Sequence, residues 1–147
     1  MVCMHASEHG EKVMLKVDGI TNDNFGLVWT DEYDSQKGRT YADMEYTVEH
    51  GAICISAMLA VILTPYTIIE RSRKGTGFDY WLGDKDSVLF QKKARLEVSG
   101  ILKGDDTAIR RRYTAKEEQT RKTDGLQLPT YISIVEFSTP KTLFDKR

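Results

Sequence analysis

The stretch "KARLEVSGI", Lys93 to Ile101, decides the fold of this chain. Apolar and polar residues alternate along it with a period of two, as in a β-strand whose faces meet different surroundings. The apolar face carries Ala94, Leu96 and Val98 and is expected to pack on the core. The opposite face carries Lys93, Arg95, Glu97 and Ser99. We therefore look for function on this polar face.

The segment "RKGTGFDYWLGD", Arg73 to Asp84, lies just upstream and combines glycines, a carboxylate and large aromatic rings. Glycine adopts positive φ at no steric cost, so Gly75 and Gly77 predict a hairpin bend. The strands on either side are expected at "YTIIERS", residues 66–72, and "FDYWLG", residues 78–83.

Strand alternation assigns the aromatic residues of this segment to two faces. Phe78, Tyr80 and Leu82 share one face and are expected to pack beneath a helix, whereas Trp81 projects on the same side as Asp79. Trp81 then has two interpretations. It either stacks on a base, as aromatic platforms do in nucleic-acid sites, or covers half-buried sheet.

Two helices are predicted around these strands. Apolar residues recur at spacings of three and four between Met44 and Leu59, which predicts a helix over residues 41–62, ended by Pro65. "DDTAIRRRYTAKEEQTRK" predicts a polar second helix, capped by Asp106 or Thr107 and reaching about Lys122.

The rest of the chain adds strands. "KVMLKVDGI", residues 12–20, and "FGLVWTD", residues 25–31, predict an N-terminal hairpin, and "TYISIVEFSTP", residues 130–140, predicts a final strand. Residues 1–10 show no periodicity and are expected to form a flexible tail. The prediction is one α/β domain over residues 11–147, a mixed sheet with helices on its faces.

Composition limits the classes of function. A chain of 147 residues with 40% hydrophobic residues, 29% charged residues and a net charge of -1 is typical of one globular domain, so any nucleic-acid site must come from local clusters of charge. Cys3 and Cys54 form no disulfide framework, which favours a reducing, cytoplasmic location. The 13-residue apolar stretch ending at Leu63 is too short for a membrane span.

Three acids occupy notable positions in this order of elements. Glu49 is on the first helix, Asp79 follows the glycine bend, and Glu97 is on the polar strand face. Carboxylates are the protein ligands of Mg²⁺, which can carry an attacking water and stabilise a leaving oxygen in phosphodiester hydrolysis.

The order helix, three strands, helix, strand over residues 41–140, with these acids, resembles the PD-(D/E)XK (restriction-endonuclease-like) nuclease superfamily. The resemblance implies that Asp79 and Glu97 bind Mg²⁺ or Mn²⁺ and that Glu49 orients a metal-bound water. Ser99 takes the position of the family's lysine, an ExS variant in place of ExK. The implied fold is a restriction-endonuclease-like core with an N-terminal β-hairpin extension.

The implied activity is that of a metal-dependent endonuclease, a hydrolase of nucleic-acid phosphodiester bonds in a bacterial defence or mobile-element system. The alternative is a catalytically inactive nuclease-fold subunit that binds a protein partner in a larger complex. The sequence leaves the oligomeric state open; a homodimer is considered because many small nucleases dimerise to cut two strands. The expected phosphate contacts are Arg71, Lys74, Lys93, Arg95 and Arg110. Lys74, Lys93 and Arg95 are also candidates for the charge that Ser99 lacks.

Each acid also has a structural interpretation. Asp79 with its glycines is compatible with a plain hairpin and a solvated carboxylate. Glu97 is compatible with a surface carboxylate paired to Lys or Arg, an arrangement worth roughly 0.2–1 kcal/mol. Glu49 lies one helical turn after Glu45, and both are compatible with a solvated helix face.

Overall fold

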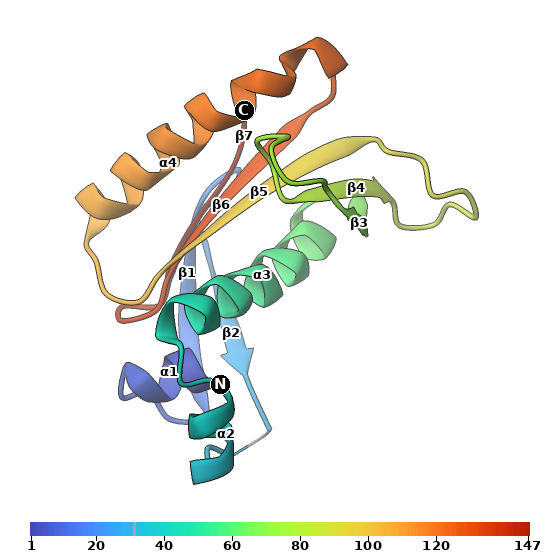
Figure 1. Ribbon diagram of the computed structural model, residues 1–147. Coiled ribbons are helices and arrows are strands. Elements are labelled where there is room, and N and C mark those ends of the chain that lie inside the picture. The colour runs from blue at the N-terminus through green and yellow to red at the C-terminus, as the bar shows by residue number, and fades with distance from the viewer. Residues whose placement is uncertain (31) are drawn as a thin grey trace.

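The computed structural model describes residues 1–30 and 32–147 as one twisted sheet with helices on both faces (Figure 1). The strands are β1 (Lys12–Gly19), β2 (Asp23–Val28), β3 (Tyr66–Arg71), β4 (Tyr80–Asp84), β5 (Ala94–Ile101), β6 (Thr130–Glu136) and β7 (Lys141–Lys146). The helices are α1 (Val2–Ala6), α2 (Ser35–Thr40), α3 (Met44–Leu63) and α4 (Asp106–Thr120), and the 3-10 helix η1 (Arg121–Leu126) continues α4.

The seven strands are ordered β2-β1-β7-β6-β5-β4-β3. Strands β5 and β6 are parallel, as are β1 and β7, and the other neighbours are antiparallel. The predicted class, a mixed α/β sheet with helices on its faces, is confirmed. The predicted N-terminal hairpin is β1 and β2, and it joins the same sheet at β7.

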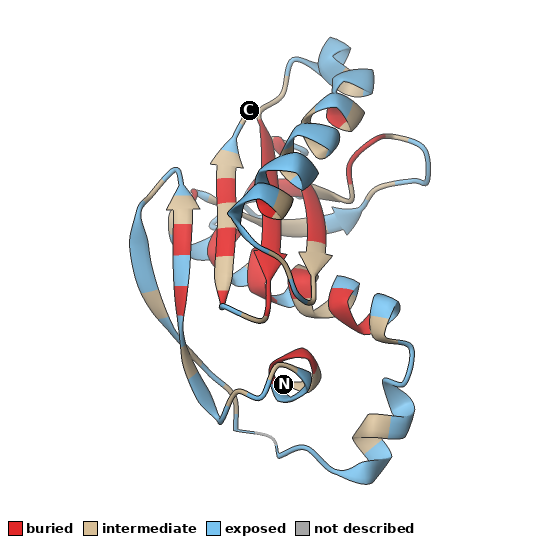
Figure 2. Ribbon diagram, turned by 90° about the vertical axis from the view of Figure 1, so that its left-hand side faces the viewer, coloured by how far each residue is buried: buried red, intermediate tan, exposed pale blue. Residues whose placement is uncertain are grey.

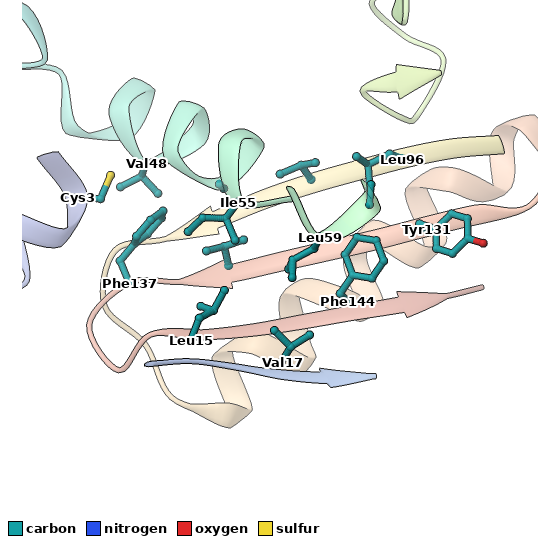
Figure 3. Packing of buried hydrophobic residues seen from close by; sticks show 14 of the residues in the cluster. Cys3, Leu15, Val17, Val48, Ile55, Leu59, Leu96, Tyr131, Phe137 and Phe144 are labelled. Atoms are coloured by element: carbon teal, nitrogen blue, oxygen red, sulfur yellow. The ribbon is translucent and has the colours of Figure 1, made fainter. Parts of the chain in front are cut away.

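The main core lies between α3 and one face of the sheet (Figure 3). Helix α3 buries Val48, Ala52, Ile55 and Leu59, which recur every three or four residues on one side of the helix. These side chains meet Leu96 and its neighbours on the apolar face of β5. The alternation read from "KARLEVSGI" therefore predicted the face that packs on α3, but the polar face of β5 is also buried.

The second face of the sheet is covered by α4 (Figure 1). The apolar contact of α4 is a small buried cluster of Ile109, Ile132 and Ile134, with the partly buried Ile101, Tyr113 and Leu143 packed against it. All seven residues of β6 are buried because helices cover both of its faces (Figure 2). Helix α4 itself is mostly polar, so polar side chains also mediate its contact with β5.

The helix starts differ from the predicted ones. Helix α3 begins at Met44 rather than at residue 41, because the side chain of Asp43 caps it by accepting a hydrogen bond from Tyr46 N at 3.2 Å. Helix α4 is capped by Asp105, whose Oδ1 accepts from Ala108 N at 2.8 Å, rather than by Asp106 or Thr107.

The N-terminal segment differs from the expected flexible tail. Residues 2–6 form α1, in which Cys3 and Met4 are buried. The Cys3 thiol donates to Thr47 O of α3 at 3.4 Å. Two adjacent apolar residues show no helical or strand periodicity, so the sequence did not predict the contact of this segment with α3. Asp31, which the predicted second strand included, lies outside the described residues.

The predicted strand over residues 130–140 ends at Glu136, and a turn then leads into β7, which was not predicted. Strand β7 inserts between β6 and β1 and buries Thr142 and Phe144. Its sequence, "KTLFDK", gives only a weak alternation between two lysines. Strand β7 is stabilised by backbone hydrogen bonds to β6 and β1, and such pairing with distant strands cannot be predicted from a short local pattern.

Helix α3 has 20 residues and is long and apolar enough, by length and composition alone, to cross a membrane. The prediction counted only 13 uninterrupted apolar residues. In this fold one side of α3 forms the core of the domain. That packing is consistent with a soluble protein.

Candidate metal centre

Asp79 is fixed beside β5 by the start of β4. The antiparallel register pairs Tyr80 with Leu96, so the preceding Asp79 falls next to Glu97. The Asp79 backbone N–H donates to Leu96 O at 2.9 Å, and its Oδ2 accepts from Val98 N at 2.8 Å. Backbone and side chain of Asp79 are thus both attached to the strand that carries Glu97.

The glycine bend before Asp79 packs against the end of α4. Gly75 and Gly77 have φ of +94° and +85°, as a glycine bend allows. A Cβ added at Gly77 would lie 2.5 Å from Gln119 O, whereas one added at Gly75 would meet nothing within 4 Å. Only a residue without a side chain lets the bend approach α4 this closely. The bend therefore positions Asp79 relative to both β5 and α4.

Glu97 is fully buried, although it lies on the polar face of its strand. Its Oε1 accepts from Lys116 Nζ at 2.5 Å and from Gln119 Nε2 at 3.0 Å, both on α4. Its Oε2 has no hydrogen-bond partner among the described residues. The carboxylate is therefore half satisfied, which is costly for a buried charged group.

Burial raises the pKa of Glu97 from 4.5 to about 7. The negative charge of Asp79 also raises this pKa, while the hydrogen bond and the positive charge of Lys116 lower it. Two carboxylates this close resist being ionised together. A proton or a cation between them would relieve the repulsion.

An open cavity of about 720 Å³ lies against these residues. Asp79, Ser99 and Lys116 form part of its wall, so Glu97 lies immediately behind side chains that face the cavity. Glu49, exposed on α3, lines the same cavity from the opposite side. Lys103 and Arg112 add positive charge to the wall.

The four predicted site residues meet in two ways. Asp79 and Glu97 are neighbours, and Ser99 follows on the same strand face; Glu49 shares only the cavity. Over residues 1–30 and 32–147, no three His, Cys, Asp or Glu side chains lie close enough to hold one metal ion together. A cation here would have two carboxylates as its acidic protein ligands.

The five expected phosphate contacts lie elsewhere. Arg71 and Lys74 are exposed near the β3–β4 bend, and Lys93 precedes β5. Arg95 is buried and donates to Thr123 Oγ1 at 2.6 Å and to Leu128 O at 2.8 Å. Arg110 lines a separate small cavity of about 50 Å³. In the described structure, none of the five lines the cavity beside Asp79.

The cations that contact Glu97 and Ser99 directly come from α4. Lys116 contacts Glu97, and Arg112 Nη1 donates to Ser99 Oγ at 3.1 Å. Arg112, Lys116 and Gln119 are spaced by four and three residues, so they share one side of the helix. This spacing was the available signal, but the predicted phosphate contacts included none of these three residues.

The aromatic residues of the bend form a separate contact. Trp81 packs edge-on against Phe78 with ring centroids 4.7 Å apart, and Lys92 Nζ lies 4.7 Å from the Trp81 ring centre. Phe78 does not join Tyr80 and Leu82 at the α3 core, because β4 begins only at Tyr80 and the alternation does not extend back to it. These contacts favour the interpretation of Trp81 as sheet cover.

Comparisons of the chain with models of known protein families, with curated proteins and with solved structures found no match.

Proposed function

We propose that this chain is a metal-dependent nuclease-like protein that hydrolyses phosphodiester bonds of nucleic acid, with Asp79 and Glu97 as ligands of Mg²⁺ or Mn²⁺. The observation that carries the proposal is the adjacency of these carboxyl groups, one of them with an unpartnered buried oxygen, behind an open and partly basic cavity. Such a pair is costly for stability alone and useful for binding a hard cation.

The order of elements supports the resemblance to the PD-(D/E)XK superfamily. Helix α3, the antiparallel strands β3, β4 and β5, helix α4 and the parallel strand β6 follow one another as helix, meander, helix and strand. Asp79 comes directly before the second strand of the meander, and Glu97 lies on the third. Strands β1, β2 and β7 would be additions to that core.

The donor set suits Mg²⁺ or Mn²⁺. Mg²⁺ commonly binds one or two carboxylates and keeps several waters, so a third acid is not required. In the proposal Asp79 Oδ1 and Glu97 Oε2 bind the ion, because Asp79 Oδ2 and Glu97 Oε1 already accept hydrogen bonds. The bound ion would activate water and stabilise the leaving oxygen. Glu49 would orient a water from across the cavity.

Lys116 would supply the positive charge that Ser99 cannot. Its ammonium group holds Glu97 Oε1, which directs the other carboxylate oxygen toward Asp79. It also lines the cavity, where it can lower the cost of bringing in a phosphate. In the proposal Lys116 of α4 takes the role that the sequence analysis assigned to Lys74, Lys93 or Arg95.

The test is cleavage of plasmid and single-stranded DNA with Mg²⁺, Mn²⁺ or EDTA. Asp79→Asn and Glu97→Gln should each reduce the metal-dependent rate on the order of 100-fold or more, as other lost transition-state contacts do. Asp84→Asn, at the exposed far end of β4, is the matched control and should cleave like the wild type. Absent cleavage, or equal rates in all four proteins, would defeat the proposal.

A second candidate is the inactive subunit that binds a protein partner. The observation that favours it is the loop between β4 and β5, where Val88, Leu89 and Phe90 are 93%, 67% and 83% exposed. Three neighbouring apolar side chains in solvent are typical of a contact surface. This role gains if the wild type neither cleaves DNA nor binds Mn²⁺ in calorimetry.

A further inference from the structure

Arg112 is attached to the site differently from Lys116. Lys116 is neutralised by the buried Glu97 carboxylate, whereas Arg112 donates one hydrogen bond to a neutral hydroxyl, Ser99 Oγ. No carboxylate of the described residues forms an ion pair with Arg112. Its positive charge therefore has no counter-charge in direct contact, although it stands close to Asp79 and Glu97.

The surroundings of Arg112 hold it at the cavity wall. Ser99 is 7% exposed and belongs to the rigid strand β5, so its hydroxyl is a fixed anchor for one guanidinium nitrogen. Arg112 is itself exposed and lines the cavity together with Asp79. A guanidinium carries five N–H donors in a planar fork, so donors remain for a ligand.

We propose that Arg112 binds a phosphate group of the nucleic-acid substrate in this cavity. The proposal rests on the function proposed above and singles out one side chain of the basic run 110–112 on α4 as a substrate contact. A guanidinium with free N–H donors can form hydrogen bonds to the oxygens of a phosphate. The bond to Ser99 already restricts the Arg112 side chain, so less conformational entropy is lost when a phosphate binds. Lys103, on the same wall, adds charge without a fixed geometry.

Ser99 is a positioning residue in this arrangement. In the resemblance to the PD-(D/E)XK superfamily this hydroxyl takes the position of a lysine, and here it accepts a hydrogen bond from Arg112 of α4. Ser99→Ala should leave the charge of Arg112 in place while releasing its orientation. We expect this variant to weaken DNA binding less than Arg112→Ala does.

The decisive experiment measures binding of a fluorescein-labelled DNA oligonucleotide, single-stranded and duplex, by anisotropy in EDTA, where no cleavage interferes. Arg112→Ala should raise the Kd about tenfold or more, as expected for a lost charge-assisted hydrogen bond. Arg112→Lys should recover only part of this loss. Arg111→Ala is the matched control, because the neighbouring Arg111 is exposed on α4 and absent from the cavity wall. It should change the Kd less than threefold.

Two results would overturn the assignment. One is an equal loss of affinity in Arg111→Ala and Arg112→Ala, which would indicate a diffuse charge effect; the other is unchanged binding in Arg112→Ala. Circular dichroism of each variant separates a lost contact from a lost fold.

The two proposals fail separately. If the wild type never cleaves DNA but Arg112→Ala binds it tenfold more weakly than Arg111→Ala, the phosphate contact stands and the enzyme proposal falls. If cleavage depends on Asp79 and Glu97 while Arg112→Ala has the KM of Arg111→Ala, the enzyme stands and the phosphate contact falls.

Discussion

Two fully buried glutamates, Glu97 and Glu136, have opposite electrostatic environments. Glu97 has one unpartnered oxygen within the described structure and a pKa raised by burial. Both oxygens of Glu136 accept hydrogen bonds, from Gly104 and from Ser138 and Thr139. Burial would raise the pKa of Glu136, but the bonds from Ser138 and Thr139 outweigh it and lower the pKa. One carboxylate stabilises its surroundings, and the other is costly to keep.

Replacing Glu97 with glutamine should stabilise the metal-free protein at high pH. A raised carboxyl pKa contributes stability that is complete below the unfolded value of 4.5 and is lost as pH rises through about 7. Glutamine resembles the protonated form at every pH. From pH 5 to pH 8 the free energy of unfolding of Glu97→Gln should therefore rise, relative to that of the wild type, by on the order of 3 kcal/mol. Urea unfolding in EDTA at both pH values measures this. A difference that does not change with pH would argue against a penalised carboxylate.

Replacing Glu136 with glutamine should have the opposite effect. The lowered pKa of Glu136 contributes stability above the unfolded pKa that is lost as pH falls through the folded value. Glu136→Gln should destabilise the protein by about 1–3 kcal/mol at pH 7, because several donors lose a charged acceptor. Urea unfolding of both proteins from pH 7 down to about pH 3 should show the deficit shrinking in acid. A deficit that grows below pH 4 would contradict this account.

At the scale of elements, the glycine bend between β3 and β4 allows the cost of backbone conformation to be measured separately from the cost of packing against α4. Gly77→Ala must place a Cβ against Gln119 O of α4, while Gly75→Ala faces open space, and both glycines have positive φ. We expect Gly75→Ala to cost about 1 kcal/mol from conformation alone and Gly77→Ala to cost clearly more, with a loss of metal binding. Thermal melts and Mn²⁺ titration of both variants provide the comparison. Equal costs would mean that the bend does not depend on its contact with α4.

Elements with strong periodicity were predictable, and elements defined by distant contacts were not. The face of α3 and the alternation of β5 are determined by many apolar residues, so sequence alone placed Asp79 and Glu97 on neighbouring strands. Helix α4 buries little apart from Ile109 and Thr120. Its rotation about its own axis was therefore undetermined, and with it the choice of Lys116 and Arg112 as the cations that meet β5.

At the scale of the whole molecule, the additions β1, β2 and β7 lie toward one edge, but Val17 of β1 and Phe144 of β7 belong to the same buried cluster as α3 and β5. The sheet runs from β3 through β6 under α3 and α4 and then continues through β7 to the N-terminal hairpin (Figure 1). The candidate centre lies between the two helices and the strands β4 and β5, away from that edge. The additions therefore contribute to the core of the domain but not to the wall of the cavity beside Asp79.

The parallel pairing of β1 with β7 has a consequence for how the chain acquires this shape. Residues 12–19 leave the ribosome more than a hundred residues ahead of β7, the parallel strand with which they pair. The hairpin β1–β2 must wait, unattached, until residues 141–146 have been synthesised and have docked beside β6. Closure of the sheet is thus a late, long-range event, and a nascent chain stalled before Pro140 exposes the apolar side of an orphaned hairpin to any strand edge nearby.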